Sequence, residues 1–411
     1  MFLSTPRVLS VIFSAVAICN ALPKSQSAYH QIGSRLNRRD ATLQAAYCSY
    51  ADAGIKQMLT FYNSSLGVFG NVDSTGKFNA HWWNSANVIT MLADYEDYFP
   101  GRNSEILTIF ANTLKVATSP FSPRGSFLNT FYDDELWWVL AWIKVYDVTG
   151  KVEYLNKAAE IYEDPKSVWN TTPCSGGIWF VPLPLHKRHS TNITSSRWNF
   201  AKTSVNAIAN ELFLTASVKL ANRIPTNSEY FTMAMEAYDW FIASGMINSK
   251  NIINDGLNIH VKPCKSGDIQ GWTYNQGVIL SGLAELTWST GDPKYNNLAN
   301  TLATASMAHY ANNSQMILHE PCEPDCSTDL SQFKGIYGRN IQFLVNRANV
   351  LPANLKTQFV TFLQNNANEI WAKDKGVDNQ LGLVWSGPPS VATVETQSSA
   401  LDAIVGAACV S

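Results

Sequence analysis

Two adjacent acidic residues, Asp133 and Asp134, stand at the start of a predicted helix and are flanked by aromatic residues. An Asp at a helix start can cap exposed amide hydrogens, and this structural role would account for one of the two acids. Cleavage of a glycosidic bond would use both, because it requires one carboxylate near the anomeric carbon and a second acid near the leaving oxygen. Successive helical side chains diverge, so the carboxyl groups can reach the separation of about 5 Å that a retaining mechanism requires.

A pair of tryptophans follows His81, on a loop that we expect to lead into a helix from Asn84. Such rings can stack on pyranose rings, whose axial hydrogens form an apolar face, but aromatic rings also fill protein cores. We expect one of Trp82 and Trp83 to pack in the core, and Trp83 to form the sugar platform. Trp137, one turn after the acids, can form an apolar wall beside them.

Polar residues stand near the starts of two other predicted helices. Two glycines, which allow the backbone to approach a ligand closely, precede Trp179, and Asn206 opens a segment with Asn210 and Glu211. The segment from Trp272 to Gly277 opens another helix. These polar groups can bind sugar hydroxyls or can cap the loops of the protein itself, and the sequence favours neither role. The candidate substrate-binding residues are Trp82, Trp83, Trp137, Trp179, Asn206, Tyr274, Asn275 and Gln276.

Amphipathic stretches separated by short breaks predict an all-α fold. The twelve predicted helices span residues 41–62, 84–98, 104–118, 134–149, 152–163, 203–223, 227–244, 274–290, 294–309, 331–349, 353–371 and 395–409. The best short candidates for strands are residues 177–183 and 252–261.

The predicted helices fall into pairs. A helix ends at Gly150 and another at Gly291, and in each case the next helix begins within a few residues. Glycine accepts the left-handed conformation that ends a helix, and a short connection produces an antiparallel hairpin. The longer connections are residues 64–83, 119–133, 164–202, 245–273 and 310–330. Six hairpins with alternating short and long connections indicate an (α/α)6 barrel with its long loops at one end, rather than an open helical solenoid, whose terminal helices need polar faces.

The N-terminal residues indicate export. A basic residue, the apolar run 8–18 and a small residue form the pattern of a secretory signal peptide, which we place at residues 1–21, and the run is too short to span a bilayer. Residues 22–39 are polar and end in Arg38-Arg39, so we expect a propeptide cleaved at this dibasic site, with an uncleaved flexible leader as the alternative. Residues 40–411 contain no Pro/Gly/Ser-rich linker and predict a single catalytic domain.

The charge and the cysteines restrict the class of protein further. The 411 residues carry a net charge of −2 without basic clusters, which argues against nucleic acid as a partner. Six cysteines remain without the signal peptide, and an even number in an exported chain suggests disulfides. Cys322 and Cys326 can close a small loop, and Cys48 with Cys409 can join the two ends of the domain. Four glycosylation sequons agree with export, at Asn63, Asn170, Asn192 and Asn312.

Together these segments resemble glycoside hydrolase family 76, the endo-α-1,6-mannanases of bacteria and fungi, over about residues 41–409. The matching motifs, in the order of the family, are Asp-Asp followed by Trp-Trp (133, 134, 137, 138), Gly-Gly-Ile-Trp (176–179), Asn-Ala-Ile-Ala-Asn-Glu-Leu-Phe-Leu (206–214), Tyr-Asn-Gln-Gly (274–277), Thr-Gly-Asp (290–292), Gln-Phe-Lys-Gly-Ile (332–336) and Thr-Gln-Ser-Ser-Ala (396–400). The chain departs from the family at Phe180, where members often have a second Trp, at Val205, which replaces a Lys, and in a longer segment 182–200. These departures concern subsite preference rather than the class of reaction.

The resemblance implies an (α/α)6 barrel and a retaining mechanism that uses no metal or other cofactor. It implies that Asp133 is the nucleophile and Asp134 the general acid/base. The acid needs a raised pKa, which a neighbouring negative charge and apolar walls such as Trp137 can supply.

The substrate that the resemblance implies is α-mannan or a mannooligosaccharide, cut by a secreted, extracellular enzyme that is free or associated with the cell wall. A wall-remodelling mannosyl transglycosylase is the first alternative. Such proteins usually carry a lipid-anchor signal, whereas here the last apolar residues fit an amphipathic helix interrupted by Asp402, which favours the free hydrolase. A non-catalytic mannan-binding protein is the second alternative, and the presence of both acids argues against it. We expect a monomer without a membrane span.

Overall fold

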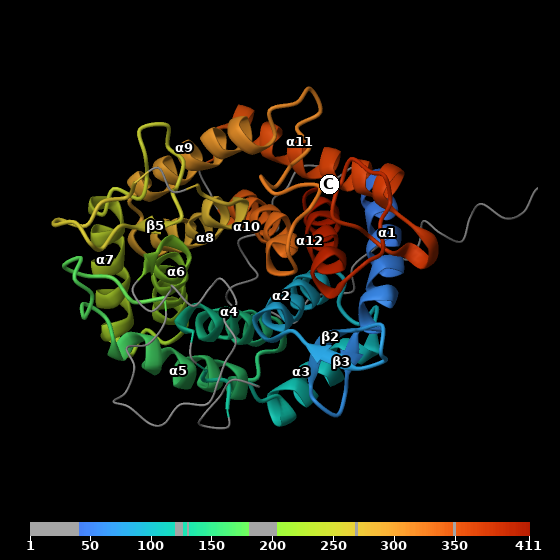
Figure 1. Cartoon of the computed structure of the whole chain (residues 1–411), viewed down its shortest axis with the longest axis horizontal. Coiled ribbons are helices and arrows are strands. Elements are labelled where there is room, and N and C mark those ends of the chain that lie inside the picture. The colour runs from blue at the N-terminus through green and yellow to red at the C-terminus, as the bar shows by residue number, and fades with distance from the viewer. Residues whose placement is uncertain (1–40, 120–125, 130, 181–203, 268–269, 348–350) are drawn as a thin grey trace, which may run out of the picture.

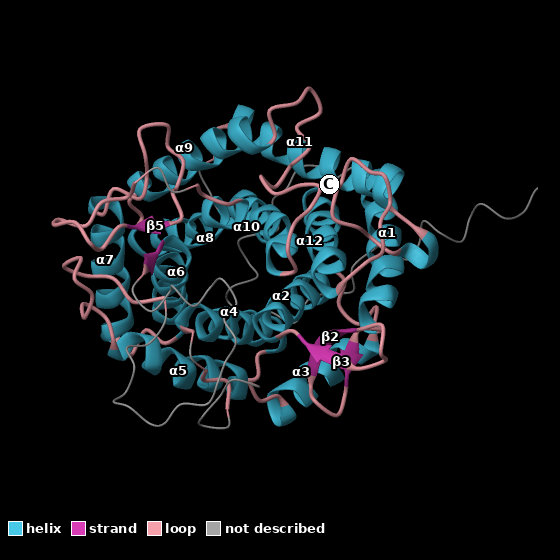
Figure 2. Ribbon diagram, viewed as in Figure 1, coloured by secondary structure: helices cyan, strands magenta, loops and turns pink. Residues whose placement is uncertain are grey.

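The computed structural model describes residues 41–119, 126–129, 131–180, 204–267, 270–347 and 351–411. Within these ranges, twelve α-helices form two concentric rings, as seen along the barrel axis in Figure 1. Strands are few and short (Figure 2). The predicted all-α (α/α)6 barrel is therefore confirmed. The predicted signal peptide and propeptide, and the sequon at Asn192, lie outside the described residues.

The inner ring consists of the even-numbered helices. They are α2 (Trp82–Tyr98), α4 (Tyr132–Thr149), α6 (Ala207–Arg223), α8 (Thr273–Thr290), α10 (Phe333–Arg347) and α12 (Val394–Val410). Each packs against the next, and α12 packs against α2, so the ring is closed. These helices are apolar nearly all round because one side faces the axis and the other faces the outer helices.

The outer ring consists of the odd-numbered helices. They are α1 (Ala41–Leu59), α3 (Ser104–Val116), α5 (Val152–Ser167), α7 (Ser228–Ala243), α9 (Pro293–Tyr310) and α11 (Ala353–Glu369). The hairpins pack as α4 with α5, α6 with α7 and α8 with α9, while α1 packs against the last helix, α12.

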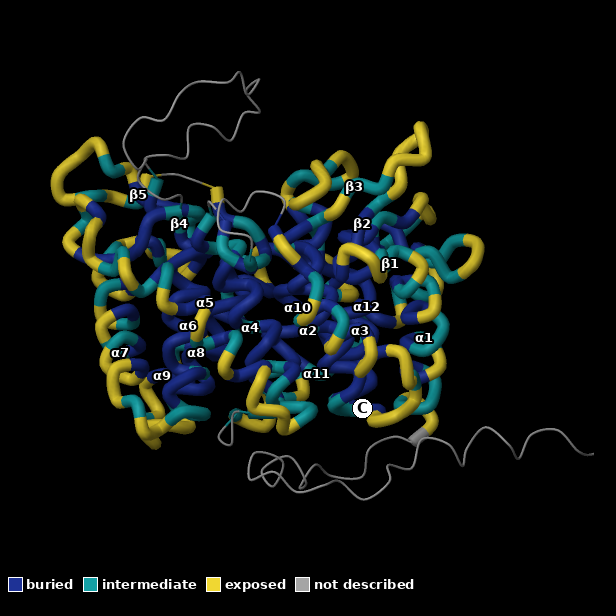
Figure 3. The backbone as a smooth tube through the Cα atoms, turned by 90° about the horizontal axis from the view of Figure 1, so that it is seen from below, coloured by how far each residue is buried: buried dark blue, intermediate teal, exposed yellow. Residues whose placement is uncertain are grey.

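Short and long connections alternate, as predicted. Gly150 and Gly291 adopt left-handed conformations, with φ of 68° and 71°, and end α4 and α8 just before the following outer helix. Every inner helix is instead preceded by a long connection, so the inner helices are parallel and their N-terminal ends meet at one end of the barrel. The strands and the larger loops lie toward this end in Figure 3.

The strands depart from the prediction. Residues 62–80, expected to be loop, form a small antiparallel sheet of β1 (Tyr62–Asn63), β2 (Val68–Val72) and β3 (Phe78–Ala80). Of the two expected strand segments, 252–261 contributes only β5 (Gly256–Leu257), which pairs with β4 (Val205–Asn206). Helix α2 also begins two residues earlier than predicted, so Trp82 and Trp83 lie in its first turn and not on the preceding loop.

Two disulfides are present in the described residues. Cys322 pairs with Cys326, as predicted, and Cys174 pairs with Cys264. The predicted bond between Cys48 and Cys409 is wrong, because both side chains are buried thiols. No helix in the described part of the chain is long and apolar enough to cross a membrane.

Candidate active site

A cavity of about 380 Å³ opens where the N-terminal ends of the inner helices meet. The first turns of α2, α4, α8 and α10 contribute side chains to it, together with the loops that precede them. Its lining residues are Ala80, His81, Trp82, Trp83, Asn84, Phe131, Asp133, Asp134, Trp137, Phe180, Tyr274, Asp329, Leu330 and Phe333. The fold thus brings together six of the ten residues predicted from the sequence.

The two adjacent acids lie in the first turn of α4, which Asn129 fixes from the preceding loop. The Asn129 side-chain oxygen accepts a hydrogen bond from the backbone N–H of Phe131 (2.8 Å), and its amide donates to Oδ2 of Asp134 (2.6 Å). The backbone N–H of Asn129 in turn donates to the buried side chain of Glu135 (2.8 Å). Asp134 is therefore held in one orientation by a bracket that continues into the core.

Burial dominates the electrostatics of the acidic pair. Burial and the neighbouring Asp134 charge raise the pKa of Asp133 well above its usual value, against the backbone N–H groups at the start of α4. Burial raises the pKa of Asp134 to about 7, against the hydrogen bond from Asn129, and the negative charge of Asp329 raises it further. Two like charges this close resist simultaneous ionisation. The pair therefore retains a proton near neutral pH, and it can supply both an anionic oxygen and an acidic hydrogen.

Aromatic rings form the walls of the cavity. Trp83 stacks on Trp137 with ring centroids 5.8 Å apart, and Tyr274 stacks on Phe333 at 3.7 Å. Trp83 is half-buried, whereas Trp82 is only 4% exposed and lies against Trp138, 4.9 Å between ring centroids. This arrangement matches the expectation that one tryptophan of the pair packs in the core.

Four predicted substrate-binding residues do not line the cavity. Asn206 caps α6 by accepting the backbone N–H of Ala209, and the Asn275 side chain accepts the backbone N–H of Trp272. Gln276 is buried and bonds both the N–H and the C=O of Ile253, which fixes the loop before α8. Trp179 is 7% exposed and lies beside the Gly176-Gly177 turn. In the structure described, their contacts are with the protein's own loops.

Sequence reasoning missed the acid opposite the pair. Asp329 begins a short 3-10 turn, Asp329–Gln332, that leads into α10, and its carboxylate accepts the indole N–H of Trp83 at 2.9 Å. Beside it, His81 Nδ1 lies 2.6 Å from Oε1 of the buried Glu395 in α12. The signal in the sequence was the motif at residues 332–336, which directly follows Asp329.

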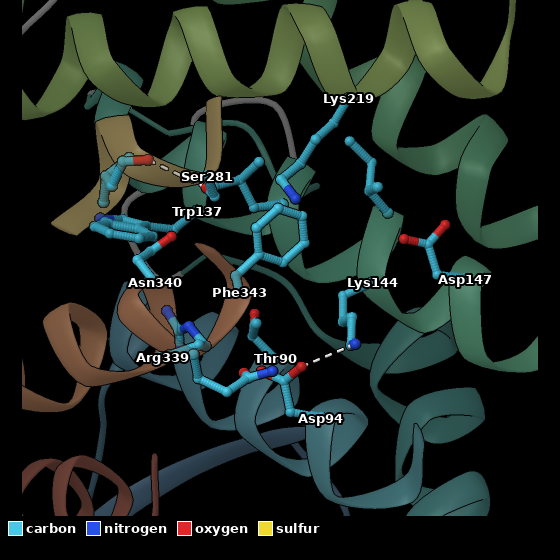
Figure 4. A pocket seen from close by; sticks show the side chains of 14 residues that line it. Thr90, Asp94, Trp137, Lys144, Asp147, Lys219, Ser281, Arg339, Asn340 and Phe343 are labelled. Atoms are coloured by element: carbon cyan, nitrogen blue, oxygen red, sulfur yellow. Dashed lines mark hydrogen bonds and ion pairs between the residues drawn. The ribbon is translucent and has the colours of Figure 1, made fainter. Parts of the chain in front are cut away.

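A second, smaller cavity of about 70 Å³ lies deeper along the barrel axis (Figure 4). Trp137 lines both cavities and separates the acidic pair from this lower chamber. The charged groups there are mostly compensated, for example Lys144, which bonds Asp94 (2.8 Å) and Asp97 (2.9 Å). No group of three or more His, Cys, Asp or Glu side chains in the described ranges is arranged to hold a metal ion.

Comparison with known proteins agrees with this geometry. The family model of glycosyl hydrolase family 76 matches residues 46–410. The mannan endo-1,6-alpha-mannosidase DCW1 of Candida albicans is 23% identical over 349 residues, which cover 80% of this chain and 72% of that protein.

Solved structures share the fold. The GH76A alpha-1,6-mannanase of Salegentibacter sp. HEL1_6 superposes with a TM-score of 0.73 at 21% identity, covering 89% of this chain and 100% of that one. An inactive variant of it, with two adjacent aspartates replaced by alanine and alpha-1,6-mannotetrose bound, gives a TM-score of 0.73 at 20% identity, covering 89% and 99%. Since the family model spans nearly all of the described residues, the chain belongs to glycosyl hydrolase family 76 and is a glycoside hydrolase.

Proposed function

We propose that the protein is a secreted, retaining endo-hydrolase of α-1,6-linked mannan. The observation that carries the proposal is the acidic pair at the start of α4, which faces an aromatic-walled cavity and retains a proton near neutral pH. The substrate is proposed from relatives named mannan endo-1,6-alpha-mannosidases and from a structural neighbour described with alpha-1,6-mannotetrose.

In the proposed mechanism, Asp133 attacks the anomeric carbon of a mannosyl unit while Asp134 donates its proton to the departing oxygen. The glycosidic bond breaks and a mannosyl ester of Asp133 forms. Asp134, now ionised, takes a proton from water, and the resulting hydroxide displaces Asp133 and restores the α configuration. The pKa of Asp134, about 7, suits a group that must be acid in one step and base in the next.

Replacing either acid tests the assignment of the pair. We expect Asp133→Asn and Asp134→Asn each to lower the hydrolysis of α-1,6-mannan by about 10²- to 10⁴-fold or more, because each removes one of the two groups that bond making and breaking require. Asp325→Asn, on an exposed loop outside the cavity, is the matched control and should keep full activity.

Release of short mannooligosaccharides by the unmodified protein supports hydrolysis, and products longer than the substrate would indicate mannosyl transfer instead. Near-normal turnover by either Asn variant, at an unchanged thermal midpoint, would show that the pair is not catalytic.

Azide distinguishes the two roles. With an aryl α-mannoside whose leaving group needs no protonation, azide should restore turnover to Asp133→Ala by direct displacement and yield the β-mannosyl azide. In Asp134→Ala the ester on Asp133 still forms, so azide should yield the α-mannosyl azide. NMR of the products measures the configuration, and the opposite pairing would exchange the two roles.

Export is proposed on two grounds. The N-terminal residues have the pattern of a signal peptide, and the described residues contain two disulfides, which form and persist in oxidising compartments.

A further inference from the structure

A third carboxylate faces the acidic pair from across the barrel. In the inner ring, α10 lies opposite α4, with α2 and α12 on one side and α6 and α8 on the other (Figure 1). Asp329 stands on the turn that enters α10, so it lines the cavity on the wall opposite Asp133 and Asp134. The mechanism proposed above assigns it no role.

The surroundings of Asp329 fix its position without consuming its bonding capacity. Its Oδ1 accepts the indole N–H of Trp83 at 2.9 Å, and the Asn84 side chain also donates to its carboxylate. Asn84 further donates to Gln332 at 2.9 Å, which ties the first turn of α2 to the turn that carries Asp329. A carboxylate offers about four acceptor positions, so these two donors leave further positions for a group in the cavity.

The charge of Asp329 is also not neutralised. No Lys or Arg in the described part of the chain forms an ion pair with it, and the nearby His81 is bonded to Glu395. The side chain is solvent-exposed in the empty cavity, in contrast to the buried acids Glu135 and Glu395. An exposed, unneutralised carboxylate at a fixed place in a sugar-sized cavity is a strong acceptor for hydroxyl donors, because hydrogen bonds to an ionised acceptor are about twice as strong as neutral ones.

We propose that Asp329 is a specificity-determining residue, which holds the Trp83 ring with one oxygen and accepts a hydrogen bond from a hydroxyl of the bound mannosyl unit with the other. This assignment rests on the proposed function, because it takes the mannan chain as the ligand. The aromatic face alone would accept any pyranose, whereas a fixed carboxylate in the plane of the indole selects sugars with a hydroxyl at the matching position.

Binding in a background without turnover tests the assignment. The parent is the Asp133→Asn variant, and isothermal titration measures its affinity for α-1,6-mannotetraose. Addition of Asp329→Asn should weaken binding by about ten- to a hundredfold, because the amide oxygen can still accept from Trp83 but a charged acceptor is lost. Addition of Asp325→Asn, which removes an exposed acid four residues away, should leave the affinity unchanged.

A double-mutant cycle separates ligand binding from support of the ring. In the same parent, Trp83→Phe removes only the N–H donor to Asp329 and keeps an aromatic face. If Asp329 binds the sugar, Asp329→Ala weakens binding severalfold more than Trp83→Phe does, and the double variant binds no more weakly than Asp329→Ala. Equal losses in Asp329→Ala, Trp83→Phe and the double variant would mean that the acid only supports the ring.

The outcomes also separate this assignment from the proposed function. Tight binding by the parent with equal affinity in its Asp329→Asn derivative would overturn the role of Asp329 alone. Failure of the folded parent to bind mannotetraose at all would overturn the proposed substrate and this assignment together.

Discussion

At the scale of single residues, the cavity depends on Asn129, which contacts no predicted substrate position but orients Asp134. Its amide hydrogen bond favours the ionised form of Asp134 and opposes the effect of burial. The pKa of about 7 is therefore a balance between these two influences, and the bracket decides the pH range over which Asp134 can act as an acid.

Replacing Asn129 should move that range upward. Asn129→Ala removes the donor that stabilises the charged carboxylate, so the pKa of Asp134 rises and the alkaline limb of kcat/KM shifts to higher pH. A pH–rate profile measures the shift. The control is Asn103→Ala, which removes the cap of α3 away from the cavity and should cost about 1 kcal/mol of stability without moving the limb. A limb that stays in place or moves to lower pH in Asn129→Ala contradicts this account.

At the scale of elements, the barrel depends on close contact between neighbouring inner helices. A Cβ placed on Gly335 of α10 would lie 2.5 Å from the Cα of Ser399 and 2.6 Å from its carbonyl oxygen, both in the backbone of α12. One turn along the same helix, a Cβ on Gly338 would meet nothing nearer than the Cα of Ala403, at 3.9 Å. Only Gly335 is therefore required by the packing of α10 on α12.

These two glycines form a matched pair of variants. Gly335→Ala should destabilise the fold by about 1–3 kcal/mol, because the backbones of α10 and α12 must separate. Gly338→Ala should be neutral or stabilise by up to about 1 kcal/mol through its higher helix propensity. Chemical denaturation measures both, and equal effects would show that the contact between α10 and α12 is more yielding than described.

The elements also show what the sequence could and could not predict. Helical periodicity and the glycines that end α4 and α8 predicted the twelve helices and their pairing, because both signals are local. The sheet at residues 62–80 was missed since its strands have only two to five residues, too few to show alternation. Asp329 was missed for a different reason: its partner Trp83 lies 246 positions away in the sequence, and only the closed ring brings the two together.

At the scale of the whole molecule, many buried carboxyl groups have raised pKa values. Burial is the largest cause in each case, and it raises the pKa of Asp374 and Asp402 to about 7, of Glu320 to about 8 and of Glu135 to about 9. Such groups bind more protons in the folded state than in the unfolded state, so their contribution is complete below their unfolded values, near 4, and is lost as pH rises toward 9. Glu285, with a pKa lowered to about 2 by Arg223, Lys219 and Arg347 despite its burial, acts in the opposite sense and is lost only in strong acid.

The fold should therefore be most stable near pH 5 and lose stability steadily toward pH 9. Glu211 offers a direct test, because it is fully buried in α6 and burial, then the charge of Asp255, raise its pKa well above the usual value. Glu211→Gln keeps the volume but cannot ionise, so its thermal midpoint should exceed that of the unmodified protein at pH 8 by more than it does at pH 5. Parallel midpoint-versus-pH curves for the two proteins would contradict this.

The docking of α12 against both α1 and α2 has a consequence for how the protein is made. Synthesis on the ribosome produces α4 and its two acids when more than half of the chain is still missing. Until α12 emerges, the nascent helices form an open arc, Glu395 is not there to hold His81, and water reaches both sides of the future interior. The enzyme thus gains its sheltered chemistry only at the end of translation, when the last helix completes the circle.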